Sequence, residues 1–353
     1  MKKSKYSKLK IFHYQEKLDS LKTDNILAPI HIRIKPTNRC NHNCWYCAYK
    51  ADNLQLGQDM IEKNFIPKEK MIEIIDNCKS MGVKAITFSG GGEPFNYRYF
   101  LDTIKQVIKN EIKFASLTNG SKLNGEIAEL FAKNATWLRV SIDGYDDESY
   151  SKYRGVKKGE FSKIIKNIEN FVNIKNRKCS IGISFIVDKD NYHKIYEFSK
   201  MMKELGVDSI KISPCIVSND GNQNNEYHKP FFDKAKELSL KVKNELEDEN
   251  FEVFESYHLL EDKFEKDYNW CPYLQILPVI GADLNIYPCQ DKAYNNEAII
   301  GSIKDKSFKE FWYNDKNKFF KINPKNQCNN HCVANSKNKM VLEYLNVGDV
   351  EFV

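Results

Sequence analysis

Apolar and polar residues along the chain form a regular succession of strand-like and helix-like segments. The first strand begins at Ile30, where apolar residues alternate with polar ones up to Pro36. Apolar residues then recur at helical spacing behind Pro67. Further strands are predicted at 85–88, 114–117, 138–142, 181–187 and 210–216, and further helices at 100–109, 127–131, 161–168 and 195–205. With a last helix around Ala235 and Val242, the pattern gives six strand–helix units.

Repeated strand–helix units predict an α/β fold, because they require parallel strands joined by right-handed crossovers. Such a sheet is doubly wound or curled, and six units favour a partial (βα)6 barrel. We expect an N-terminal extension at 1–29, the barrel at 30–249, and a linker with a small metal-stapled domain at 250–353. The asparagine-rich stretch 219–225 is predicted to be a mobile loop.

Composition and charge narrow the classes of protein. The chain has 353 residues, 41% of them hydrophobic, which is enough for a large core. It has no run of about 18 apolar residues and no signal-like segment, so we expect a cytoplasmic protein without a membrane partner. The net charge of +6 is mild, which disfavours nucleic acid and suits an anionic small substrate. Ten cysteines in such a chain favour metal-binding thiols over disulfides.

Three cysteines, Cys40, Cys44 and Cys47, follow the first strand in the order C-x3-C-x2-C. Loops at the carboxyl ends of parallel strands host active sites. Three thiolates would leave one iron of a four-iron cluster without a protein ligand, and an open metal position can bind a small molecule. This spacing predicts a reaction centre, with part of a structural zinc site as the alternative.

A glycine-rich segment, Gly90 to Gly92 followed by Glu93, ends the second strand. Alone it could be a phosphate-binding turn or a tight turn, although it lacks the Lys-Ser/Thr pair of a P-loop. Together with the three cysteines and Tyr46, it makes residues 30–217 resemble the radical S-adenosylmethionine (radical SAM) enzymes. In that family three cysteines hold a [4Fe-4S] cluster and S-adenosylmethionine chelates the fourth iron. Its reductive cleavage leaves a 5′-deoxyadenosyl radical.

The resemblance assigns contacts with S-adenosylmethionine to seven residues: Tyr46, Gly91, Gly92, Glu93, Ser141, Asp143 and Arg154. Glu93 would assist in neutralising the ammonium group. Ser141 and Asp143 would contact the ribose or the carboxylate, and Arg154 would pair with the methionine carboxylate. Two alternatives stay open: Arg154 in a surface ion pair, and Ser141 merely ending a strand.

Four late cysteines are spaced C-x17-C-x38-C-x3-C: Cys271, Cys289, Cys328 and Cys332. Four thiolates satisfy a structural zinc or a cubane cluster completely. The stretch from Cys271 through 301–303 and 311–312 resembles the auxiliary-cluster domains called SPASM and, in shortened form, twitch. The resemblance implies one auxiliary [4Fe-4S] cluster, which would relay an electron or brace the fold; zinc is the alternative.

The remaining cysteines have separate interpretations. Cys78 lies on the apolar stripe of a helix and Cys179 precedes a strand, so both are expected to pack in the core. Cys215 follows the sixth strand at the edge where the radical would form, and its thiol could donate a hydrogen atom. An inert buried thiol is the alternative for Cys215.

The preferred function is a radical SAM oxidoreductase or epimerase that abstracts hydrogen from a carbon of a small polar substrate, such as an amino sugar or sugar nucleotide. The short extension before the barrel favours it, because it leaves no room for a leader-peptide-binding domain. A flavodoxin or ferredoxin would supply electrons. The alternatives are a peptide- or protein-modifying radical SAM enzyme and a non-catalytic iron–sulfur or zinc protein.

Overall fold

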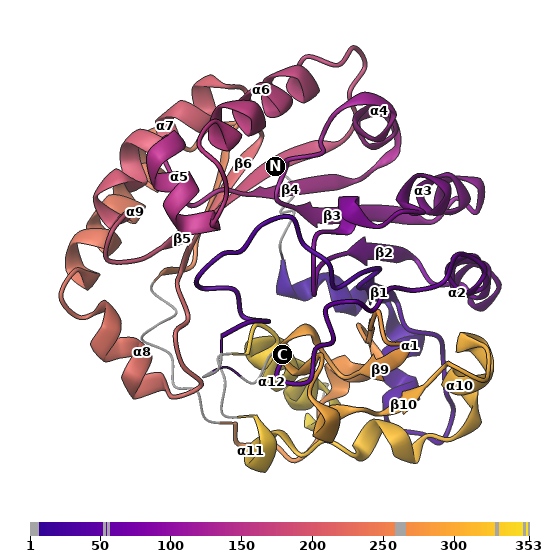
Figure 1. Cartoon of the computed structure of the whole chain (residues 1–353). Helices are drawn as coiled ribbons and strands as arrows, with labels where there is room; N and C mark the ends of the chain where they lie inside the picture. Colours follow the sequence, from indigo (N-terminus) through magenta and orange to yellow (C-terminus); the bar gives the residue numbers. More distant parts are fainter. Residues whose placement is uncertain are drawn as a thin grey trace.

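A curved, mainly parallel sheet organises the molecule. The computed structural model describes residues 7–51, 54, 57–257, 266–328, 332–348 and 351. Over these residues it has a ten-stranded sheet in the order β10-β9-β8-β1-β2-β3-β4-β5-β6-β7, in which β1 to β7 and β8 pair in parallel (Figure 1). The seven consecutive parallel strands are β1 (His31–Ile34), β2 (Ala85–Phe88), β3 (Lys113–Thr118), β4 (Trp137–Ser141), β5 (Ser180–Val187), β6 (Ser209–Pro214) and β7 (Glu252–Glu255).

Crossover helices surround the outer face of this sheet (Figure 1). They are α2 (Lys68–Met81), α3 (Phe100–Lys109), α4 (Gly125–Asn134), α5 (Asp147–Arg154), α6 (Glu160–Val172), α7 (Ile195–Glu204), α8 (Gly221–His228) and α9 (Phe232–Leu246). In α2, Met71 and Cys78 belong to the buried stripe, and Gly82 ends the helix in the left-handed conformation. Cys179 is also fully buried, as predicted. The partial barrel is confirmed, and β7 continues the sheet beyond the six predicted strands.

The asparagine-rich stretch is a helix, so the prediction of a mobile loop is wrong. Asp220 caps α8 by accepting a hydrogen bond from the Asn222 backbone. The side chain of Asn224 is fully buried, and it accepts from the Val217 N–H and donates to the Ser218 carbonyl. The side chain of Asn224 thus satisfies backbone groups of the segment just before the helix. Composition alone does not reveal this role of asparagine.

The C-terminal region joins the same sheet. β8 (Val279–Ile280) pairs with β1, and β9 (Asn285–Tyr287) and β10 (Gly301–Ser302) extend it as antiparallel strands. Helices α10 (Phe308–Asn314), α11 (Pro324–Gln327) and α12 (Asn335–Asn346) follow. Short 3-10 helices lie at Lys8–His13, Pro94–Asn96, Tyr192–Lys194, Pro272–Gln275, Gln290–Lys292, Asn296–Ala298 and Asn317–Phe320.

The N-terminal helix α1 (Gln15–Leu21) packs against this C-terminal region. The carbonyl of Leu27 accepts hydrogen bonds from the Lys17 ammonium at 2.8 Å and from the Trp312 indole at 3.0 Å. Burial, with the charge of Lys316, lowers the pKa of Lys17 to about 7. The N-terminal segment and α10 therefore share a partly buried polar contact.

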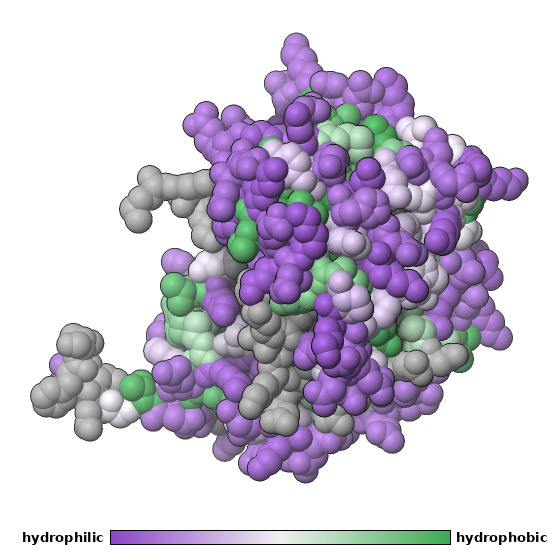
Figure 2. Space-filling view, turned by 90° about the vertical axis from the view of Figure 1, so that its left-hand side faces the viewer, coloured by the Kyte–Doolittle hydropathy of each residue, from purple (hydrophilic) through white to green (hydrophobic). Residues whose placement is uncertain are grey.

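The surface is largely hydrophilic. The face shown in Figure 2 carries apolar residues only in small separate areas. Within the described part of the chain, no helix combines the length and apolarity needed to cross a bilayer.

Candidate active site

The loop that leaves β1 carries the first three cysteines, each of which is a partly exposed residue. Hydrogen bonds between backbones fix the loop, including one of 2.8 Å from the Asn43 N–H to the Arg154 carbonyl at the end of α5. Burial raises the pKa of Cys40 to about 11, and the charges of Cys44 and Cys47 add to the rise. The three thiols therefore share one neighbourhood at the carboxyl edge of the sheet.

The glycine-rich end of β2 packs directly on the cysteine loop. The Gly92 N–H donates to the Thr37 carbonyl at 3.0 Å. A Cβ on Gly92 would lie 2.1 Å from the Arg39 carbonyl oxygen, and one on Gly91 would lie 2.2 Å from Asn38 Oδ1. Gly92 must be glycine because two backbones meet there, whereas a Cβ on Gly91 would displace the side chains of Asn38 and Met60. The predicted contact of both glycines with S-adenosylmethionine stays a prediction.

Glu93 joins the ends of β2 and β3. Its buried carboxylate accepts hydrogen bonds from the Thr118 hydroxyl at 2.6 Å, the Asn119 N–H at 2.7 Å and the Phe95 N–H at 3.1 Å. Burial raises the pKa of Glu93, and these hydrogen bonds oppose the rise. The structure thus shows Glu93 bracing two strand ends; its role at the ammonium group stays a prediction.

A buried ion pair supports the cysteine loop from α5. The Arg154 guanidinium donates to Asp143 Oδ2, and Tyr46 donates its hydroxyl to the same oxygen. The other oxygen of Asp143 accepts from the Ile186 N–H at 2.8 Å. Arg154 also reaches Cys44 Sγ at 3.5 Å. The sequence alternative of a surface pair is wrong for Arg154, which is 5% exposed.

Among the buried polar atoms at this edge that have no hydrogen-bond partner in the described residues are Arg154 Nε and Ser89 Oγ. S-adenosylmethionine presents a carboxylate and ribose hydroxyls that could accept from such donors. Together with the three thiols, these atoms fit the predicted cofactors. As placed, no three described His, Cys, Asp or Glu side chains converge on one metal ion. A cubane spreads its thiolates over separate irons.

Ser141 and Cys215 lie farther along the same edge. Ser141 ends β4 and is paired in register with Ser184 of β5. Cys215 follows β6 and is 1% exposed, and its carbonyl accepts a hydrogen bond from His228 Nε2 at 2.8 Å. Burial raises the pKa of Cys215 well above that of a free thiol. Hydrogen donation by Cys215 stays a prediction beside the inert alternative.

The four late cysteines also share a neighbourhood. Burial raises the pKa of Cys271 to about 11 and that of Cys332 to about 12, and the charges of neighbouring cysteines contribute. Asn338 of α12, 1% exposed, donates to Cys271 Sγ at 3.2 Å and accepts from the Tyr273 N–H at 3.0 Å. Sequence reasoning missed Asn338, since nothing local marks it.

Lys35 was missed as well. Fully buried at the end of β1, it donates to the Gly90 carbonyl and, at 2.5 Å, to the Tyr49 hydroxyl. Burial lowers the pKa of Lys35, while the charges of Cys289 and Cys47 oppose the fall. Lys35 therefore lies within electrostatic reach of one cysteine from each set.

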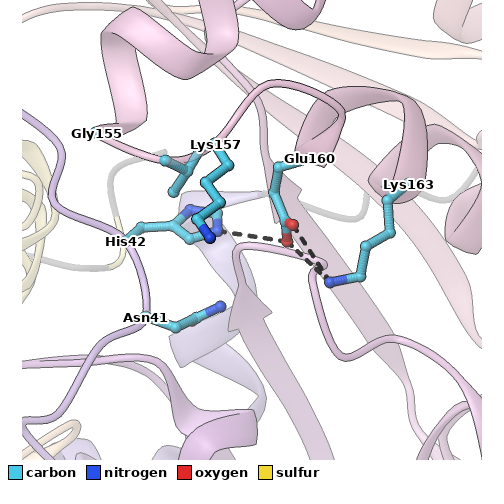
Figure 3. A pocket seen from close by; sticks show the side chains of 7 residues that line it. Asn41, His42, Gly155, Lys157, Glu160 and Lys163 are labelled. Carbon is cyan, nitrogen blue, oxygen red and sulfur yellow. Dashed lines mark hydrogen bonds and ion pairs between the residues drawn. The ribbon is translucent and has the colours of Figure 1, made fainter.

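A polar recess of about 450 Å³ adjoins the cysteine loop (Figure 3). The ring of His42 lies inside it with Nε2 3.9 Å from Glu160 Oε1, which also pairs with Lys163 at 3.1 Å. Burial, with the charges of Arg154 and Lys163, lowers the pKa of His42 to about 3, so its ring is neutral. The lining residues are Asn41, His42, Gly155, Val156, Lys157, Glu160 and Lys163.

Comparison with known proteins identifies the barrel. Residues 34–202 match the radical SAM superfamily. The chain contains a radical SAM domain. The protein is therefore an enzyme, and the resemblance predicted over residues 30–217 is confirmed. The prediction of a [4Fe-4S] cluster with S-adenosylmethionine is confirmed at the level of the family. The auxiliary cluster stays a prediction. Which thiols hold each cluster stays a prediction.

Relatives of this radical SAM protein match well beyond the barrel. A cysteine-type anaerobic sulfatase-maturating enzyme of Clostridium novyi is 28% identical over 320 residues, which are 83% of this chain and 82% of that protein. The structure of Streptococcus suis SuiB bound to precursor peptide SuiA has a TM-score of 0.63 at 19% identity, over 90% of this chain and 72% of SuiB. The structure of anSMEcpe with bound AdoMet has a TM-score of 0.57 at 20% identity, over 83% of each chain.

Proposed function

We propose that this radical SAM enzyme modifies a side chain of a peptide or protein. The observation that carries the proposal is the 28% identity with a sulfatase-maturating enzyme over 83% of the chain, which reaches past the barrel into the region of the late cysteines. That extent favours the peptide-modifying alternative over the small polar substrate preferred from sequence. The experiment must distinguish modification of a peptide from oxidation or epimerisation of an amino sugar.

In this proposal, Cys40, Cys44 and Cys47 hold the cluster that binds S-adenosylmethionine. The four late cysteines hold one auxiliary cluster. When bound, the first cluster and S-adenosylmethionine supply a carbon radical that removes a hydrogen atom from the substrate. The donor sets support this division, because three thiols leave a cubane one open iron and four thiols leave none.

The surrounding residues hold the loop and balance its charge. The Arg154 guanidinium donates to the sulfur of Cys44, and the hydrogen bond from the Asn43 N–H to the Arg154 carbonyl anchors the loop to α5. Lys35 lies buried within electrostatic reach of Cys47 and Cys289, so its ammonium form would stabilise thiolate ligands on both sides.

The test begins with anaerobic reconstitution, iron counting and reduction with flavodoxin or dithionite. We expect about eight irons per chain and release of 5′-deoxyadenosine. Zinc in place of iron, without cleavage, would contradict both radical proposals.

The substrate class is tested next, by incubating the reconstituted enzyme with peptides that carry one central Cys, Ser or Ala and, in parallel, with sugar nucleotides. A mass change in a peptide together with matching 5′-deoxyadenosine supports the proposal. Conversion of the sugar nucleotides with none of the peptides refutes it. Deuterated solvent in the same reactions reports whether an exchangeable thiol returns hydrogen.

A further inference from the structure

The inner face of the barrel is charged. Alternate residues of a strand point to opposite faces, and helices cover the outer face (Figure 1). Ile32 of β1 and Ile210 of β6 are fully buried beneath those helices. The alternate positions are Arg33 in β1, Arg139 in β4 and Lys211 in β6, each partly exposed. A packed barrel interior would instead carry branched aliphatic residues at such positions.

Burial and the positive charges of neighbouring side chains lower the pKa of Lys211 and of Arg33. Burial lowers the pKa of Lys211 to about 8, with the positive charges of Arg139, Arg33 and Lys337 adding to the fall and Asp291 opposing it. Burial likewise lowers the pKa of Arg33, and Arg139 contributes. Asp291 opposes the fall at Arg33 as well, so it offsets part of this positive charge. A further anion bound beside the cations would lower the remaining cost of gathering like charges.

A polar row connects this cluster to the predicted cofactor site. Ser141 of β4 is in register with Ser184 of β5, and Ser184 is in register with Lys211 of β6. Neighbouring strands lie about 4.8 Å apart, so the backbone of Lys211 is about 10 Å from that of Ser141. Ser141 and Ser184 carry small side chains at this register, and both are partly exposed. A group bound at Lys211 would thus be held at a short, fixed distance from the radical.

We propose that Arg139 and Lys211, with Arg33 beside them, bind a carboxylate of the substrate on the inner face of the barrel. The inference rests on the proposed function in taking that carboxylate from an acidic residue of a peptide, close in sequence to the residue that is modified. A guanidinium and an ammonium together suit a carboxylate, since arginine binds both oxygens and lysine adds a compact charge.

The cations also have neighbours in the auxiliary region. Cys289 raises the pKa of Arg33, and Cys332 raises that of Lys337, so both can balance the charge of thiolates. The opposing charge that acts on Lys211 comes from Asp291. No cysteine is among the charges that act most strongly on Lys211. A change at Lys211 therefore tests binding of the substrate separately from balancing the charge of the cluster thiolates.

The first experiment measures protection of Lys211 in the reconstituted holoenzyme with S-adenosylmethionine. Acetylation by an amine-reactive ester is followed by mass spectrometry, with exposed Lys113 at the start of β3 as the internal control. The probes are two pools of ten-residue peptides that differ in one residue, Glu or Gln. We expect the Glu pool to slow acetylation of Lys211 on the order of tenfold relative to the Gln pool, with Lys113 unchanged. Equal protection by both pools overturns the site.

The second experiment reverses the charge. Lys211→Glu should shift the preference to a pool that carries Lys at the varied position, and Lys211→Met should abolish the preference. Lys113→Glu should behave as the wild type. Iron content and circular dichroism report folding of each variant. If Lys211→Met lowers iron content and keeps the preference for Glu peptides, the cation balances cluster charge and the site is refuted.

Product formation in the same reactions separates this inference from the proposed function. Modified peptide formed equally from both pools supports the function and overturns the site. Protection of Lys211 by free glutarate or a sugar phosphate, with no product from any peptide, supports the anion site and overturns the peptide substrate.

Discussion

Removing either partner of the buried Asp143–Arg154 pair should destabilise the radical SAM domain by about 3–5 kcal/mol, because the remaining charge is left in the interior. The side chains of Asp143 and Arg154 are 1% and 6% exposed. In Arg154→Met, the carboxylate would keep two neutral donors, the Tyr46 hydroxyl and the Ile186 N–H. In Asp143→Asn, the guanidinium would lose its carboxylate and keep a neutral amide oxygen at best, besides the 3.5 Å contact with Cys44 and ring contacts.

The double variant Asp143→Asn/Arg154→Met should cost less than the sum of the two single variants, by about 2–3 kcal/mol, since neither charge remains to be desolvated. Urea unfolding of the metal-free protein, followed by far-UV circular dichroism, measures the three free energies of unfolding. We also expect each single variant to take up less iron, because the pair fixes the loop that carries Cys44.

The matched control is the exposed ion pair between Lys152, which lies in α5 like Arg154, and Asp190. Its Nζ–Oδ2 distance is 3.3 Å, and the two side chains are 73% and 46% exposed. Its cycle should give a coupling of about 0–1 kcal/mol. Additivity within about 0.5 kcal/mol at Asp143 and Arg154, as for a surface pair, would refute the reasoning.

Three further outcomes are expected. Because the pKa of Lys17 falls to about 7 from 10.5 on folding, the unfolded state binds more protons than the folded state between these pH values, and stability should rise with pH there. In thermal melts, the melting temperature of Lys17→Met should rise less steeply with pH than that of the wild type. Gly92→Ala, whose Cβ meets the Arg39 carbonyl, should lose iron that Gly348→Ala, with open space, retains. Cys215→Ala should change product yield or stereochemistry; unchanged product would exclude the thiol as hydrogen donor.

Much of the fold was accessible to sequence reasoning because local patterns determine strands and helices. Helix α3 has the predicted bounds, Phe100–Lys109, and the buried stripe of α2 includes Cys78 as expected. The asparagine-rich helix α8 escaped because buried side-chain hydrogen bonds, such as those of Asn224, oppose the usual meaning of a polar run. β7 escaped because a short strand after a charged stretch carries little pattern.

The spacing of residues along the sequence predicted most of the candidate site. The rest depends on contacts between segments that are distant in the sequence. The cysteines and the glycine-rich strand end identified the family by themselves. Their surroundings did not: Glu93 is engaged by Thr118 and Asn119, and Arg154 by Asp143. Such pairs depend on which strand ends lie together.

The sequence alone determined that three thiols follow a strand, that strands alternate with helices, and hence that this is a radical SAM barrel with a second cysteine set. The tertiary structure decided which side chains lie next to one another. A period of two shows that Arg33, Arg139 and Lys211 alternate with apolar residues, but strands from distant parts of the chain must be ordered and curved before those three charges meet. Register and curvature arise from long-range packing, which a local pattern does not encode.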